Sequence, residues 1–526
     1  MGCIRGVDRN QAFFTSLDGM VGEECMARVI DKFVDACDLG ALGFTRTEPA
    51  PTGRSGYTAS ALTKLYVYGY ENKVRSSRSL EEECGRNVEA MWLTHGLRPD
   101  HSTISEFRRL NIGPLQELFT SFTRICRSWG DMVGGELVAI DGTKVKASNN
   151  KKNNHSRKKT EERLARTEEK IDEAAREYLE ACEAADLAGQ GAQGKAAAGL
   201  LELFGRKETL ESYLAQMDAT GSDEVSTVDP DARMMATNRG GVDTAYNVLS
   251  TVDARHHLII DFDVTTSAAD QGQLGPMHGR LYGQGYRGFT SLTDKGFYNG
   301  ECLAKAKGLE VTAICARQRP PQPKGRPSDL CTSRFLYDRE ADSYTCPEGA
   351  VLTLRGTGAA KRRKYSNREA CRSCPRLREC CTAAKTGHRV ITRGEFADVY
   401  DEADRLFEEN PELYALRMQL VEHPFGTIKR TMDGGYFLLR TLRKVRTEAA
   451  LLCLGYNLKR VSNVLGFKGL MARLDALVEA RVAGDAAGLG GHMPCPCAKT
   501  GPTRARQAPV SRFLGPRARA GLSAAA

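Results

Sequence analysis

Long apolar segments are missing from this sequence. No stretch of its 526 residues approaches the roughly 18 consecutive apolar residues that a membrane-spanning helix needs. The first eleven residues, Met1 to Gln11, carry charges and lack the apolar centre of a signal peptide. These absences exclude the class of helical membrane proteins, and we expect a cytoplasmic protein without a membrane partner.

A strong charge of one sign is also missing. The formal net charge is +9 and the pI is about 8.7, which fits a partner made of phosphates but is common in proteins that never contact DNA. The 17 cysteines are spread through a long chain, unlike those of a small secreted protein, so we expect most of them to be reduced and buried. A hydrophobic content of 41% is enough to fold the two or three domains that this length predicts.

Large apolar side chains are sparse in three regions. Residues 148–225 combine dense alternating charge with helical spacing, which predicts an insertion shaped as a helical hairpin or coiled-coil arm, with helices over 161–186 and 198–217. Its simplest interpretation is a solvated insertion without a specific partner. Residues 317–391 form a second, cysteine-rich insertion. Residues 484–526 are rich in Gly, Ala, Pro and Arg, and we expect them to be a disordered basic tail that attracts nucleic acid weakly.

The cysteine-rich insertion carries the motif C-R-S-C-P-R-L-R-E-C-C. Two thiolates separated by two residues, with further cysteines nearby, can close a tetrahedral Zn²⁺ site, and a region with so few apolar residues would need such a staple to fold. The same pattern is compatible with thiols that bind no metal. The arginines and lysines between the cysteines would make the folded insertion basic, a second possible DNA contact. The candidate zinc ligands are Cys346, Cys371, Cys374 and Cys380, with Cys331 as a spare thiol.

Helical periodicity dominates residues 12–130. Within them, the segment R-P-D-H-S-T-I-S-E-F-R-R offers Asp100, Ser102 or Thr103 as a helix cap. The helix that follows would carry an apolar and basic stripe formed by Ile104, Phe107 and Arg108. Such a helix is suited either to a DNA groove or to an ordinary solvated surface.

The remaining sequence predicts an α/β core. Strands and helices are expected in the order β-β-β-α-β-α-β-α, and the family resemblance described below implies that the five strands form one mixed sheet with flanking helices. The expected segments are strands 137–141, 244–253 and 257–266, a helix over 270–282, a strand ending at Asp294, a helix over 301–307, a strand over 309–316, and helices that carry Glu422 and continue to about Ala483.

Three carboxylates occupy notable positions in this core. Asp141 and Asp294 each end a short β-prone run, and Glu422 lies seven residues before Lys429, close to two helical turns, so these two side chains would share a helix face. Taken singly, each acid is compatible with ordinary turn or surface chemistry. Together they suit two Mg²⁺ ions about 3.5–4 Å apart, which clamp the oxygens of a phosphodiester. Pro424 further predicts that the helix starts or kinks near Glu422.

At these residues the sequence resembles the DDE transposases of bacterial insertion sequences. The matching segments are I-D-G-T-K-V-K-A, T-D-K-G-F-Y-N-G-E, V-E-H-P-F-G-T-I-K-R and F-L-L-R-T-L-R-K-V-R-T-E-A-A-L-L-C-L-G-Y-N-L-K-R. With the N-terminal helices, the resemblance spans roughly residues 10 to 470. It implies an RNase H-like catalytic core over 131–316 and 392–483, interrupted by the first insertion, and an N-terminal helical DNA-binding domain over 1–130.

The resemblance also implies roles for individual residues. Asp141, Asp294 and Glu422 would be the catalytic ligands of two Mg²⁺ or Mn²⁺ ions, and Lys429 would hold a DNA phosphate. Tyr414 and Arg417 are similar to the first residues of a Y-R-E-K signature, although four residues separate Arg417 from Glu422 where that signature has three. The full set of expected DNA contacts is Lys429, Arg417, Tyr414, Lys144, Lys295 and Arg108.

The implied activity is metal-dependent cleavage at the ends of an insertion element, followed by transfer of the freed 3′-hydroxyl to target DNA. It requires no nucleotide cofactor, and pairing of two ends implies a dimer or higher assembly on DNA. Two alternatives share the same fold: a DNA nuclease, and a decayed transposase that binds DNA without cutting it. A third alternative is a zinc-dependent DNA-binding regulator that works through the cysteine cluster and the N-terminal helices.

Overall fold

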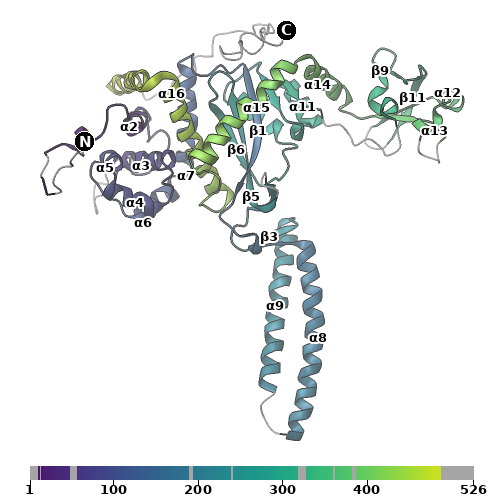
Figure 1. The fold of residues 1–526 in the computed structure, drawn as a ribbon, viewed down its shortest axis with the longest axis horizontal. Coiled ribbons are helices and arrows are strands. Elements are labelled where there is room, and N and C mark those ends of the chain that lie inside the picture. Colours follow the sequence, from purple (N-terminus) through teal and green to yellow (C-terminus); the bar gives the residue numbers. More distant parts are fainter. Residues whose placement is uncertain are drawn as a thin grey trace, which may run out of the picture. The chain divides into compact units, whose positions relative to one another are not determined.

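The structure is a computed structural model that describes residues 10–486, except for 12–13, 48–55, 189–192, 238–240, 318–326, 359–361 and 382–386 (Figure 1). The chain divides into two compact units, the first formed by residues 1–134, 141–268 and 420–499, and the second by 135–140, 269–419 and 500–526. The expected disordered tail lies outside the described residues beyond residue 486. None of the described helices combines the length and the apolarity that crossing a membrane requires.

Helices make up the N-terminal part of the first unit, as the periodicity predicted. They are α1 (Leu17–Met20), α2 (Met26–Ala36), α3 (Ala59–Glu71), α4 (Ser77–Arg86), α5 (Val88–Leu93), α6 (His101–Leu110) and α7 (Ile112–Ser128). The predicted cap of α6 is confirmed, because the Asp100 side chain accepts a hydrogen bond from the Thr103 amide at 2.9 Å. The long C-terminal helix α16 (Leu442–Ala486), bent at Gly466, packs against α2, α3 and α7 in the same unit.

The central sheet is mixed and has six strands rather than the expected five. They are β1 (Leu137–Lys146), β4 (Arg233–Thr237), β5 (Gly241–Asp253), β6 (Ile259–Thr265), β7 (Thr290–Thr293) and β8 (Thr312–Cys315), with β4, β5, β1, β7 and β8 in that order and β6 also pairing with β5. The additional strand, β4, pairs antiparallel with β5. Its sequence R-M-M-A-T lacks the apolar alternation by which the other strands were predicted.

Strand β1 extends further than the sequence suggested. It was expected to end at Asp141, but it continues to Lys146, so Asp141 lies inside the strand. The cause is a continued alternation in which Thr143 and Val145 are buried while Lys144 and Lys146 are more exposed. The chain passes from the second unit to the first within this strand, between residues 140 and 141.

Parallel strands and three helices form the core of the second unit. The first residues of β1 pair parallel with β7, and β7 pairs parallel with β8. Helix α11 (Gly300–Gly308) and helix α14 (Ala397–Glu409) pack against β8, and α10 (Leu274–Gly283) packs against α11. The helix expected from Asp270 therefore begins four residues later, at Leu274.

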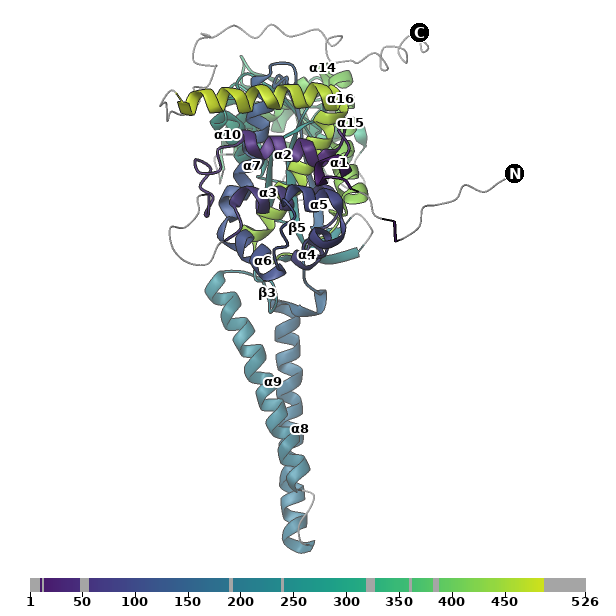
Figure 2. The ribbon, with the colours of Figure 1, turned by 90° about the vertical axis from the view of Figure 1, so that its left-hand side faces the viewer.

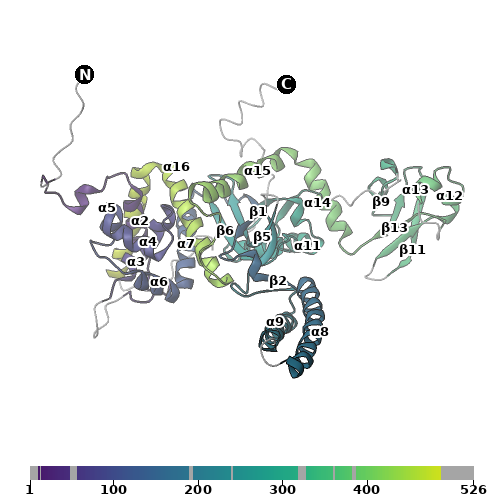
Figure 3. The same cartoon turned by 60° about the horizontal axis from the view of Figure 1, so that its bottom comes forward.

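The cysteine-rich insertion folds into a small antiparallel sheet that was not predicted. Its strands are β9 (Leu336–Asp338), β10 (Ser343–Thr345), β11 (Val351–Thr357), β12 (Arg363–Ser366) and β13 (Val390–Arg393), accompanied by α12 (Arg368–Arg372) and α13 (Leu377–Cys380) (Figure 3). A small core holds this sheet together, formed by Phe335, Tyr344, Leu352, Tyr365 and Ile391.

The predicted helical hairpin is confirmed. Helices α8 (Arg157–Ala188) and α9 (Gln193–Thr220) lie side by side in Figures 1 and 2, and they extend downward from a two-stranded pair of β2 (Asn154–Ser156) and β3 (Glu224–Ser226). A salt bridge of 2.8 Å between Lys207 and Glu168 connects the two helices. Few of their described apolar residues are buried, as the dense charge predicted.

Candidate active site

In the first unit, the segment that carries Glu422 is attached to strand β1. Lys429 donates hydrogen bonds to the Thr143 hydroxyl at 2.5 Å and to the Lys144 carbonyl at 3.2 Å. These acceptors follow Asp141 by two and three residues. The structure therefore brings Lys429 to the part of the strand that begins with Asp141.

Helix α15 (Pro411–Gly426) carries Glu422. Of the two outcomes expected near Glu422, a helix start or a kink, the helix start is not observed: α15 continues through the buried Pro424 and passes into a π-helical segment, Thr427–Thr431. A proline cannot donate its backbone hydrogen bond, and a change of helical pitch next to it is a common consequence. The Glu422 side chain is exposed at this position.

His423, next to Glu422, is held by a residue of α16. The Tyr456 hydroxyl lies 2.9 Å from His423 Nδ1 and donates to the His257 carbonyl at 2.8 Å. Burial lowers the pKa of His423, and the positive charge of Arg460 adds to this effect. A neutral His423 that packs and orients the end of α15 agrees with these contacts.

A loop after the π-helical segment also follows β1. Lys146 and Tyr436 form a parallel bridge, and the Phe437 amide donates to the Lys146 carbonyl at 2.8 Å. Gly434 is required here, because a Cβ atom at this position would lie 2.9 Å from the Ile428 carbonyl oxygen. Lys429, Tyr436 and Phe437 thus contact the second half of β1 within one unit.

The same loop is fixed by a buried carboxylate. Glu448 is fully buried and accepts hydrogen bonds from the Leu438 and Leu439 amides at 3.0 Å. It also receives a hydrogen bond from Arg75 at 3.2 Å, and Arg75 in turn donates to the Tyr436 carbonyl at 2.8 Å. Burial raises the pKa of Glu448, against the opposing effect of the two amides and of Arg75.

In the second unit, Asp294 directly follows β7, as predicted. Its side chain accepts a hydrogen bond from the Lys295 amide at 2.6 Å and caps a short 3₁₀ helix, Lys295–Phe297. The Asp294 carboxylate is partly exposed, and Lys295 is exposed. This geometry leaves the carboxylate at the carboxyl end of a parallel strand, a common location for binding sites in open α/β sheets.

The residues that follow Asp294 are anchored on α14. Tyr298 donates a hydrogen bond to Asp404 at 2.8 Å and stacks on Tyr400, with ring centroids 4.8 Å apart. Gly300 is needed for this packing, because a Cβ atom there would lie 2.5 Å from the Cβ of Phe396. These contacts with α14 were not predicted, although the aromatic residues of F-Y-N-G could have indicated packing after Asp294.

Tyr414 and Arg417 belong to the same neighbourhood as Asp294. Burial raises the pKa of Tyr414, Arg417 opposes this shift, and Asp294 adds to it. Cys315, whose thiol donates to the Asp294 carbonyl at 3.3 Å, is also influenced by Arg417, and burial raises the pKa of Cys315 to about 12. Within this unit, Arg417 and Tyr414 therefore lie near enough to Asp294 to interact with its charge.

Arg108 has a different environment from the one expected of a DNA contact. Its guanidinium lies 5.5 Å from the centre of the Tyr66 ring, and Glu448 and Tyr70 contribute to its raised pKa. The neighbouring Arg109 is exposed but bonded to Glu106 at 2.6 Å. The Arg108 side chain is thus directed into the helical part of the first unit.

The expected metal ligands are divided between the units. Asp141 and Glu422 belong to the first and Asp294 to the second. Across the described ranges, no group of three or more His, Cys, Asp or Glu side chains is gathered closely enough to hold a metal ion. The donor chemistry of the three acids nevertheless fits Mg²⁺, which prefers carboxylate oxygens.

Two family models match the chain. Residues 345–462 match the Transposase DDE domain, and residues 15–110 match the Transposase domain (DUF772). The chain contains transposase domains. This pair of matches is typical of the DDE transposases of insertion elements, and it confirms the resemblance noted in the sequence. The DDE match includes Glu422 and Lys429, whereas Asp141 and Asp294 precede it. No curated protein and no solved structure matches the chain.

Proposed function

We propose that the chain is a metal-dependent DNA transposase that cleaves the ends of an insertion element and joins them to target DNA. The proposed catalytic residues are Asp141, Asp294 and Glu422, on an RNase H-like core. The element order supports this core, because β1, β5 and β6 are followed by α10, β7, α11 and β8, and later by the helix of Glu422. This is the β-β-β-α-β-α-β-α order expected for such a core.

The observation that carries the proposal is the pair of hydrogen bonds from Lys429 to Thr143 and Lys144. Two motifs almost 300 residues apart in sequence, each expected to supply one catalytic acid, are thereby attached to one another inside the first unit. If the two motifs were unrelated, there would be no reason for a lysine of one motif to form hydrogen bonds next to the acid of the other.

The three carboxylates would hold the metal ions. When bound, two Mg²⁺ or Mn²⁺ ions supply charge stabilisation for the attacking and leaving oxygens of an in-line displacement. The protein contributes orientation: β1 fixes the backbone of Asp141, the short 3₁₀ helix fixes Asp294, and α15 carries Glu422. The positive charges of Lys429, Lys144 and Lys295 are proposed to attract DNA phosphates, and Arg417 is a cation beside Asp294.

DNA is the proposed partner, and the transposase matches imply that it is bound. Joining two element ends requires that both be held in one complex, so we propose a dimer or a higher assembly on DNA. The helical region of residues 15–110, which matches a transposase domain, is proposed to contribute DNA contacts. The basic strand β12 of the insertion offers a second set of contacts through Arg363 and Lys364.

A joining assay tests the proposal. The purified chain is incubated with Mg²⁺ or Mn²⁺, labelled DNA taken from both flanks of the coding region, and a target plasmid. Joined products are expected, and Asp294→Asn and Glu422→Gln should abolish them while DNA retention survives. Glu412→Gln is the matched control, because Glu412 is an exposed glutamate on the same helix, α15.

The other outcomes identify the alternatives. Cleavage without joining indicates a nuclease, and DNA retention without cleavage indicates a decayed transposase. If Asp294→Asn leaves every DNA-dependent activity unchanged, the three acids are not the catalytic residues, and a zinc-dependent regulator becomes the better description.

A further inference from the structure

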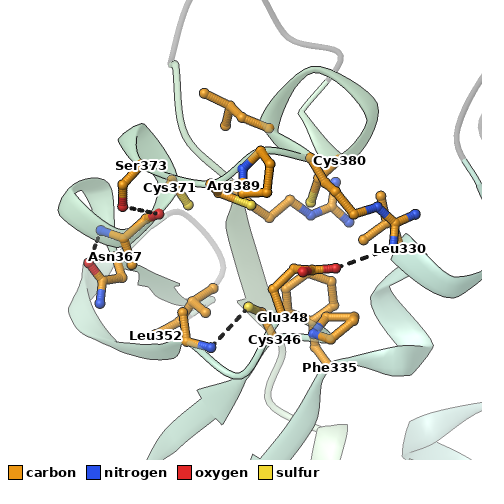
Figure 4. Close-up of a pocket in the computed structure, with 17 residues that line it drawn as sticks. Leu330, Phe335, Cys346, Glu348, Leu352, Asn367, Cys371, Ser373, Cys380 and Arg389 are labelled. Atoms are coloured by element: carbon orange, nitrogen blue, oxygen red, sulfur yellow. Dashed lines mark hydrogen bonds and ion pairs between the residues drawn. The ribbon is translucent and has the colours of Figure 1, made fainter.

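The cysteine-rich insertion contains a pocket of about 290 Å³ that the proposed chemistry does not use. Its lining includes four thiols, those of Cys346, Cys371, Cys374 and Cys380. Figure 4 shows Cys346, Cys371 and Cys380 on different sides of this pocket. The pocket is partly open to solvent and shares Phe335 and Leu352 with the small core of this sheet.

The structure separates these four cysteines from the other two in the insertion. The Cys331 thiol donates to the Pro327 carbonyl at 3.7 Å, and the Cys381 thiol donates to the His388 carbonyl at 3.3 Å. Neither of them lines the pocket. The sequence had left Cys331 as a possible replacement ligand, and its position now argues against that role.

The turn that carries Cys346 is suited to a thiolate. The Ala350 amide donates a hydrogen bond to Cys346 Sγ at 3.3 Å, and the turn closes through Gly349, whose φ of +81° favours glycine. A backbone amide that donates to sulfur stabilises the negative charge of a thiolate, the form that binds metal. This contact is independent of the C-x-x-C spacing.

Two contacts hold the opposite sides of the pocket together. Asn367, which caps α12 ahead of Cys371, donates to the Val351 carbonyl at 2.9 Å, just after the Cys346 turn. Arg376, between Cys374 and Cys380, is bonded to Glu348 of the same turn at 3.2 Å. Protein hydrogen bonds and ion pairs therefore already connect the chain segments that supply the four thiols, without a metal ion.

We propose that this pocket is a structural Zn²⁺ site formed by Cys346, Cys371, Cys374 and Cys380. In the described part of the insertion the four sulfur atoms are not yet gathered around one point. Binding draws them to about 2.3 Å from the ion and closes the pocket. Each thiol gives up its proton as its sulfur binds, so uptake of one Zn²⁺ by the reduced insertion releases up to four protons. The ion would complete a core that is otherwise small.

Metal analysis of the full-length chain tests this site. Protein purified in reducing buffer and supplied with Zn²⁺ is expected to retain one equivalent after gel filtration. The serine variants of Cys346, Cys371, Cys374 and Cys380 should each lose most of this zinc. The variants Cys331→Ser and Cys381→Ser are matched controls from the same insertion and should retain it.

Cobalt and thiol measurements keep the test independent of folding failures. Co²⁺ bound to the unmutated chain should give the intense visible bands of a tetrahedral thiolate complex. A thiol reagent should find four fewer reactive cysteines with Zn²⁺ than after chelation. The proposal is overturned if the reduced chain binds no zinc, if the controls lose as much zinc as the four variants, or if mass analysis shows these cysteines paired as disulfides. These readouts do not involve DNA joining, so they succeed or fail separately from the transposase proposal.

Discussion

Lys429 allows a structural contact and a DNA contact to be separated by experiment. Its ammonium group is bonded to the Thr143 hydroxyl and the Lys144 carbonyl, and the side chain is only partly exposed. Lys429→Met removes both hydrogen bonds and the charge. Hydrogen bonds to a charged group contribute about 1.5–3 kcal/mol, so the variant should lose roughly this much unfolding free energy. Denaturant unfolding measures the loss.

Thr143→Val is the matched variant. It removes the hydroxyl acceptor but leaves the Lys429 charge and the Lys144 carbonyl in place, so the loss of stability should be smaller than for Lys429→Met. If Lys429 also contacts a phosphate, Lys429→Met should reduce the slope of log affinity against log salt concentration by about 0.9, because one fewer counterion is released. Thr143→Val should keep the slope of the unmutated chain.

The salt titration decides between these roles. Equal slopes for the unmutated chain and Lys429→Met would refute the phosphate contact and leave Lys429 as a purely structural link. An unchanged unfolding free energy in Lys429→Met would refute the structural link itself. Because the two measurements are independent, the phosphate contact and the structural contact of Lys429 can each be refuted without affecting the other.

Three further predictions follow from buried groups. Glu448→Ala leaves Arg75 without its buried carboxylate and should lower the unfolding free energy by about 3–5 kcal/mol; a loss below about 1 kcal/mol in denaturant unfolding would contradict the buried network. Tyr456→Phe removes the hydroxyl that contacts His423 Nδ1, and should slow joining about fivefold without changing DNA affinity, since one hydrogen bond contributes about 1 kcal/mol. The reverse result, weaker binding with an unchanged joining rate, would rule out this positioning role. Burial lowers the pKa of His278 from 6.5 to about 4, so its protonation favours the unfolded chain. The contribution of His278 to stability should be constant above pH 6.5 and fall by about 3 kcal/mol between pH 6.5 and 4, at about 1.4 kcal/mol per pH unit. His278→Gln should remove this contribution and leave the similar one of His257, whose pKa burial also lowers to about 4, so the profile should become less steep. An unchanged profile would show that His278 does not contribute.

Local patterns predicted much of the fold. The strands that end near Asp294 and those around 244–266 were recognisable because short apolar runs were bounded by turn residues, and the charged hairpin was recognisable from its helical spacing. The end of β1 was misplaced because Asp141 and Gly142 were interpreted as closing the strand, whereas Thr143 and Val145 maintain the inward alternation. A strand can continue through lysines when they occupy its exposed face.

Contacts between residues far apart in the chain could not be predicted from local sequence patterns. The bond between Lys429 and Thr143 joins residues 286 positions apart, and that between Arg75 and Glu448 spans 373 positions. No local spacing encodes either pair. The small sheet of the insertion was missed for another reason: four of its five strands have only three or four residues, and its core has only five buried side chains, two of them tyrosines.

Arg108 shows how a helical pattern can mislead about DNA contacts. It lies four residues after Ile104 and one after Phe107, both fully buried, so it belongs to the edge of the apolar face of α6. A long arginine stem packs readily along such a face, with its charged end against an aromatic ring. The more exposed face of α6 carries Ser102 and Ser105, which line an open groove of about 560 Å³ together with residues of α4. Substitutions at Ser102 or Ser105 would test a DNA-binding role of the exposed face of this helix, whereas substitution of Arg108 also removes its contact with the Tyr66 ring.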